Sequence, residues 1–67
     1  GEPGVRVALE LRLDDRRGQP LLVRDYVAEE PAAGASFEDA VAAFDTAVGS
    51  IFTRFLADAR AVVAAPR

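Results

Sequence analysis

The sequence predicts an α/β unit with the order strand, strand, helix, which is an α+β fold when the 67 residues are taken alone. Hydrophobic and polar residues alternate over 5–13 and, less strictly, over 21–29, as they do in β-strands. Hydrophobic residues then recur every three or four positions over 36–63, which is typical of an amphipathic α-helix. A polar, glycine-containing stretch separates the two strands and favours a hairpin.

The first strand has one hydrophobic and one polar face. Its inward residues are Val5, Val7, Leu9, Leu11 and Leu13. In the loop that follows, Gly18 is the residue that can adopt a positive φ angle. The charged residues 14–17 are typical of a solvated turn, and we assign them no function.

The second strand is partly hydrophobic on both faces. Leu21, Val23 and Val27 lie on one side, and Leu22, Tyr26 and Ala28 on the other. Such a strand is typical of a sheet that is covered on both sides or packed against a partner. Pro31 ends the strand, and residues 31–35 form a short connection to the helix.

The helix has recognisable start and stop signals. The Ser36 hydroxyl can cap the first turn, and Asp39 can reach back to the Ser36 backbone N–H. Glu38 and Asp39 lie at the positive end of the helix dipole, and Arg60 lies near the negative end. Pro66 is expected to stop the helix.

One stripe of this helix is expected to be buried. Its members are Phe37, Val41, Phe44, Val48, Ile51, Phe55, Ala59 and Val62. Phe52 and Leu56 widen the stripe, while Ala40, Ala43 and Ala47 form a smooth strip on which a neighbouring element can approach. Gly49 marks either close packing or a bend, at a cost of roughly 1 kcal/mol relative to Ala.

The predicted helix is longer than the predicted strands. A helix of about 27 residues spans about 40 Å, whereas a nine-residue strand covers about 30 Å. We therefore expect a single partial domain over 1–67, belonging to a mixed-sheet sandwich that missing residues or a second copy complete.

Composition excludes several classes of function. The chain has no Cys and no His, so a disulfide and the usual zinc or iron ligands are ruled out. The net charge of −3 argues against a nucleic-acid partner, and no apolar run approaches the roughly 20 residues of a membrane span. Nucleophilic triads, phosphate loops and tuned carboxylate pairs are missing, so we expect neither a cofactor nor catalysis.

Two segments carry a resemblance to a known family. They are Gly18–Tyr26, followed by Pro31, and Ser36–Ala47, which contains a V-x-A-F-D-x-A segment at Val41, Ala43, Phe44, Asp45 and Ala47. Together they resemble the C-terminal part of the ABC-type transport auxiliary lipoproteins. The resemblance covers about residues 5–59 and about the last third of a family member; the lipid-modified Cys and the first strands and helices have no counterpart here.

The resemblance implies a non-catalytic periplasmic component of a lipid transport system, with an ABC transporter and MCE-type subunits as partners. It also implies attachment to the outer membrane through a lipidated N-terminus in the full-length protein. The alternative from the residues themselves is a freestanding ββα interaction module that forms a homodimer through its helix.

Either hypothesis requires an interaction surface. The residues predicted to contribute to it are Tyr26, Phe44, Val48, Ile51, Phe52 and Phe55. A small regulatory or toxin-neutralising protein is a third possibility, but it would need a basic DNA-reading element, which the sequence lacks.

Overall fold

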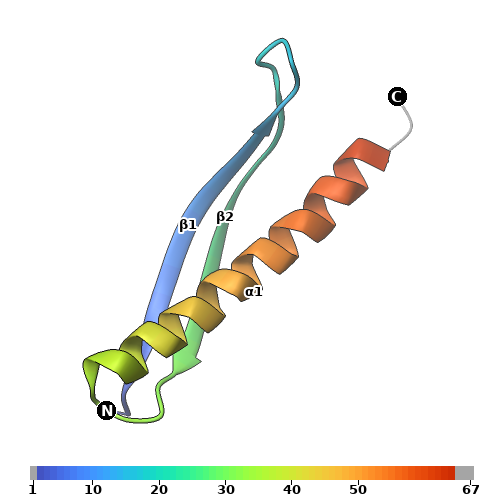
Figure 1. Cartoon of the computed structure of the whole chain (residues 1–67). Helices are drawn as coiled ribbons and strands as arrows, with labels where there is room; N and C mark the ends of the chain where they lie inside the picture. The colour runs from blue at the N-terminus through green and yellow to red at the C-terminus, as the bar shows by residue number, and fades with distance from the viewer. Residues whose placement is uncertain (1, 65–67) are drawn as a thin grey trace.

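The structure, a computed structural model, describes residues 2–64 and contains an antiparallel β-hairpin followed by one long helix (Figure 1). β1 is Gly4–Asp14, β2 is Pro20–Pro31 and α1 is Phe37–Ala64. The predicted hairpin and helix, an α+β fold for this chain, are therefore confirmed. α1 begins beside the end of β2 and runs back along one face of the sheet, giving a two-layer body of 48 × 19 × 17 Å (Figure 1).

The hairpin register places the larger hydrophobic side chains on the face that α1 covers. Leu9 lies opposite Tyr26, and Leu13 lies opposite Leu22. Tyr26 and Leu22 are buried. The inward residues predicted for β1 are all buried or half-buried, namely Val5, Val7, Leu9, Leu11 and Leu13. Since side chains alternate between faces along a strand, the neighbours of these residues form the outer face of the sheet.

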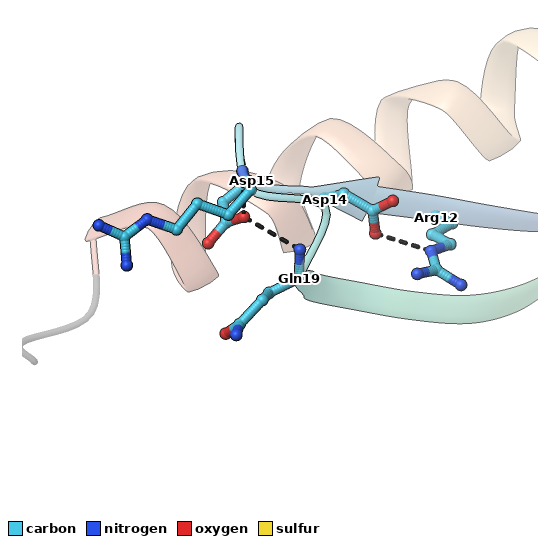
Figure 2. Close-up of polar contacts among 5 residues, drawn as sticks. Arg12, Asp14, Asp15 and Gln19 are labelled. Atoms are coloured by element: carbon cyan, nitrogen blue, oxygen red, sulfur yellow. Dashed lines mark hydrogen bonds and ion pairs between the residues drawn. The ribbon is translucent and has the colours of Figure 1, made fainter.

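The hairpin loop is closed by Asp15, as Figure 2 shows. Its carboxylate Oδ1 accepts the backbone N–H groups of Arg17 at 2.8 Å and Gln19 at 3.0 Å. Gly18 has a φ of 83° and donates its N–H to the Asp15 carbonyl at 3.0 Å. Arg12 pairs with Asp14 at 2.7 Å beside the loop (Figure 2). The charged residues here therefore close and flank a turn, and Gly18 supplies the positive φ predicted for it.

The start of α1 is capped by Ser36. Its hydroxyl accepts the Asp39 backbone N–H at 3.1 Å, as predicted. The predicted reciprocal bond from Asp39 to the Ser36 N–H is not among the hydrogen bonds of residues 2–64. The Asp39 carboxylate lies against Gly34 instead, with Oδ2 only 2.6 Å from where a Cβ would be. Pro66, predicted to stop the helix, lies outside the described residues.

The core lies where the middle of α1 crosses the hairpin. Val7, Tyr26, Ala47 and Ile51 form its buried cluster, in which Ala47 and Ile51 are completely shielded from solvent. Burial of a side chain such as Ile51 contributes about 1.5–3 kcal/mol. Partly buried hydrophobic residues pack around this cluster: Val5, Leu9, Leu11, Ala28, Val48 and Phe55.

The predicted stripe of α1 is correct in its second half, where Val48, Ile51, Phe55, Ala59 and Val62 are buried or half-buried, and wrong in its first half. Phe37, Val41 and Phe44 were expected to be buried, but they are 80%, 48% and 53% exposed. The alanine strip, with Ala43 and Ala47 buried, packs on the hairpin instead. At Ala47, which is completely buried in one cluster with Tyr26, the small side chain allows the helix to approach the sheet closely.

The relative lengths of the elements also differ from the prediction. The strands have 11 and 12 residues and the helix has 28. β2 therefore spans about 40 Å and α1 about 42 Å, so the helix and the sheet are nearly equal in length. Uncovered apolar surface remains because the hydrophobic part of α1 is wider around its circumference than the hairpin can cover.

Enlarging the alanine strip should separate the two layers. We expect Ala47→Leu to lower the free energy of unfolding by about 1–3 kcal/mol, because Ala47 is completely buried beside Tyr26. The measurement is urea unfolding followed by circular dichroism at one protein concentration. Ala42→Leu, on the exposed side of α1, is the matched control and should change stability by no more than about 0.5 kcal/mol. Equal effects of the two changes would contradict the close-approach explanation.

Candidate functional site

A polar cluster joins β2 to the C-terminal half of α1. The Tyr26 hydroxyl donates a hydrogen bond to Asp58 Oδ2 at 2.7 Å. The same oxygen lies 3.1 Å from the Arg24 Nη1 atom, which completes an ion pair. Asp58 therefore holds two residues of the inward face of β2 from one position on the helix.

Arg54, one turn before Asp58, makes a second connection. Its guanidinium donates to the Val27 carbonyl oxygen at 2.6 Å and lies 5.8 Å from the centre of the Tyr26 ring. The Phe55 ring meets the Tyr26 ring edge to face, with 6.1 Å between centroids. Tyr26 is thus contacted by three side chains from two successive turns of α1, which fixes both the rotation and the position of the helix on the sheet.

The cluster favours a neutral tyrosine beside a charged aspartate. Burial raises the pKa of Tyr26 above its usual value, and the hydrogen bond to Asp58 and the negative charge of Asp58 raise it further. The hydrogen bond from Tyr26 is the main cause that lowers the pKa of Asp58, followed by the bond from Arg24, while burial opposes them. A tyrosine with a raised pKa is a weaker acid, and an aspartate with a lowered pKa is a weaker base. The pair is therefore suited to a fixed hydrogen bond and poorly suited to proton transfer near neutral pH.

The sequence-predicted interaction residues fall into two groups. Tyr26 and Ile51 are buried between the layers, with Phe55 packed against them. Phe44 and Phe52 lie outside the core cluster and are 53% and 46% exposed. Val48 lies between the groups and is half-buried. The structure therefore divides these six residues between the internal core and an external surface.

Sequence reasoning missed Arg24, Arg54 and Asp58. A signal for two of them was present, because Ala40, Ala43, Ala47 and Ile51 continue at the same spacing into Arg54 and Asp58. Polar residues at the end of a small-residue strip indicate that the strip meets polar partners. Arg24 is two residues before Tyr26 in β2, so the two side chains lie on the same face of the strand. Both can therefore reach the turn of α1 that contains Asp58.

An exposed hydrophobic surface runs along α1 beside the alanine strip. We call this surface the free α1 face. Its large members are Phe37, Val41, Phe44, Phe52, Leu56 and Val63. Near its C-terminal end the surface is hollowed, and the hollow is lined by Leu56, Ala59, Arg60, Val63 and Ala64. A continuous apolar surface of this kind on a small protein is typical of an interaction site.

A second open surface, the outer sheet face, lies on the side of the hairpin that α1 does not cover. Val23 and Val27 are 51% and 41% exposed there, opposite Arg12 and Ala8. Most of its other residues are charged; they include the ion pair Arg6–Glu29 at 3.5 Å and the like-charged cross-strand pair Glu10 and Asp25. This surface is mixed in character, whereas the free α1 face is mainly hydrophobic.

Residues 2–64 contain no cluster of three acidic residues placed to hold a metal ion. α1 is long and apolar enough to cross a membrane when judged by length and composition alone. Most of this stretch of α1 is exposed, and Arg54 and Asp58 bind the hairpin.

Comparison with known proteins gave no match to a protein family, to a curated protein or to a solved structure. The resemblance described above therefore rests on the quoted residues of this chain.

The polar cluster predicts a pH-dependent stability. Because the pKa of Asp58 is lowered by folding, the stabilisation from its charge is complete above the unfolded-state pKa of about 4 and is lost as the pH falls through the folded-state value. For Tyr26, whose pKa is raised, the stabilisation is complete below about pH 10 and is lost as the pH rises through the folded-state value. We expect Asp58→Asn to be less stable than the parent at pH 7 and to lose less stability on acidification, as measured by urea unfolding at each pH.

Tyr26 is the only tyrosine in the chain, so phenolate absorbance titrates this residue alone. We expect its pKa in the folded protein to lie above that of a free tyrosine and to decrease in Asp58→Asn, which removes the negative charge. Asp45→Asn, the same change at an exposed position of α1, serves as the control and should leave the titration unchanged. An Asp58→Asn titration identical to that of the parent would show that the two side chains are not coupled.

Proposed function

We propose that this chain is a non-catalytic auxiliary component of an ABC-type lipid transport system that contains MCE-type subunits. It works in the periplasm, and in the full-length protein a lipidated N-terminus attaches it to the outer membrane. Its role is to bind protein partners. The main support for the proposal is that the protein has two open surfaces, the free α1 face and the outer sheet face. Its polar cluster, in contrast, holds the helix on the hairpin.

The segment behind the family resemblance supports this role through the way its residues are divided. Ala43 and Ala47 of the V-x-A-F-D-x-A segment pack on the hairpin, whereas Val41 and Phe44 belong to the free α1 face. The two alanines therefore pack the helix on the hairpin, and the larger Val41 and Phe44 remain available for contact with a partner. One short segment thus serves both the fold and the assembly, which gives the pattern a physical basis.

The outer sheet face is the surface suited to the transporter subunits. Reversible protein interfaces combine apolar and charged groups and are about as polar as the rest of a protein surface. Val23 and Val27 supply the apolar part, and Arg6, Glu10 and Asp25 are among the charged residues around them. These valines point away from α1, so changing them leaves the core cluster intact.

A binding experiment with purified subunits tests the proposal. The chain is immobilised and exposed separately to the permease, ATPase and MCE-type proteins encoded beside it. We expect capture of at least one of them, and we expect Val23→Glu together with Val27→Glu to weaken it at least about tenfold, because two charges would be placed in the contact.

The matched control is Val23→Thr together with Val27→Thr, which keeps the β-branched shape and adds no charge. Circular dichroism should show the same helix content in all three proteins. Failure of the parent chain to bind any of these subunits, or the absence of such genes from its neighbourhood, would contradict the transport role.

A further inference from the structure

We propose that the free α1 face is an interface between two copies of this chain, with the two α1 helices packed antiparallel. This would also suit a freestanding ββα module, and it does not depend on the transport role. The exposure of the large residues of this face shows that the hairpin leaves the surface open. Four further features indicate that the occupant is a second copy.

The first feature is the symmetry of the hydrophobic positions about Ser50. An antiparallel pair of identical helices brings together residues at equal distances on either side of its midpoint. The free α1 face and its half-buried neighbours fall into such pairs: Phe37 with Val63, Val41 with Ala59, Phe44 with Leu56, and Val48 with Phe52. Each of these hydrophobic positions therefore meets a hydrophobic position on the partner.

The second feature is the separation of charge along α1. Glu38 and Asp45 border the free face in its N-terminal half, and Arg60 borders it in its C-terminal half. Antiparallel packing places Arg60 of one copy near Glu38 of the other, whereas parallel packing places like charges side by side. Opposite charges at the margins of a helix pair set its orientation, and the antiparallel arrangement also opposes the two helix dipoles favourably.

The third feature is the hollow in the C-terminal half. Leu56, Ala59, Arg60 and Val63 surround it, with the i, i+3, i+4, i+7 spacing of the holes that receive a side chain in coiled-coil packing. In the antiparallel pairing, the residue of the second copy that lies opposite this hollow is Val41, with Phe37 and Phe44 on either side of it. The small Ala59 leaves the space, and the larger N-terminal residues can fill it.

The fourth feature is Gly49, which sits next to the midpoint. A Cβ at this position would meet nothing within 4 Å, so packing within one chain does not explain the glycine. An exposed glycine in a helix costs roughly 1 kcal/mol relative to alanine. Close approach of a second helix near the symmetry axis accounts for the missing side chain.

The first test is the solution mass of the full 67-residue chain, measured by light scattering across a dilution series with circular dichroism on the same samples. We expect a dimer that dissociates on dilution. Phe52→Gln, which keeps a good helix former at the position next to the axis, should raise the dissociation constant at least about tenfold. Val23→Thr on the outer sheet face is the matched control and should leave the dissociation constant unchanged.

The second test establishes orientation. The chain contains no cysteine, so introduced thiols are the only ones present. We expect a mixture of Val41→Cys and Ala59→Cys chains to form a disulfide-linked heterodimer under mild oxidation, and each variant alone to remain largely unlinked. Linkage of each variant to itself would show parallel packing and overturn the proposal.

Two other outcomes would also overturn it. One is a folded monomer at all concentrations up to hundreds of micromolar. The other is a monomer in solution that binds vesicles of phosphatidylethanolamine and phosphatidylglycerol through Phe52, which would make the free face a lipid-binding surface. Neither result bears on the capture of transporter subunits by Val23 and Val27, so failures of the two proposals can be distinguished.

Discussion

The contact between Tyr26 and successive turns of α1 determines which surfaces of this protein are internal. Ala47 and Ile51 pack beside the ring, Phe55 and Arg54 contact it, and the Asp58 carboxylate accepts its hydroxyl hydrogen bond. Hydrophobic packing alone would tolerate several rotations of the helix, because much of the circumference of α1 is apolar. The Tyr26–Asp58 hydrogen bond and the Arg24–Asp58 ion pair can form in only one rotation of the helix. These polar contacts therefore select one orientation, which hydrophobic packing then stabilises.

This selection has a cost in uncovered surface. Turning the alanine strip toward the hairpin allows close approach, yet it leaves Phe37, Phe44 and Leu56 more than half exposed. A chain of 67 residues has little additional core with which to offset such exposure. Assembly through the free α1 face would bury these side chains, and this links the internal geometry to the proposed interface.

Periodicity predicted the elements well because each has a simple pattern. The alternation from Val5 to Leu13, the Gly18 turn and the Ser36 cap are local signals, and the structure places all three as expected. The stripe predicted for α1 was correct from Val48 to Val62 and wrong in its first half, because a hydrophobic scale ranks Phe44 above Ala43 and contains no information about the opposing surface. The polar cluster was beyond local prediction for a related reason. Asp58 is 32 residues from Tyr26 in the sequence, and their contact exists only once the helix has docked.

The position of the free α1 face has a consequence for the architecture of an assembly. Val48 and Phe55 border both the core and this face, so the open surface is a flank of the helix and not its back. A second helix packed on a flank lies within the same layer as the first, and its hairpin then lies within the layer of the first hairpin. Two hairpins brought edge to edge could pair the backbone groups that each leaves open and continue as one four-stranded sheet beneath two helices.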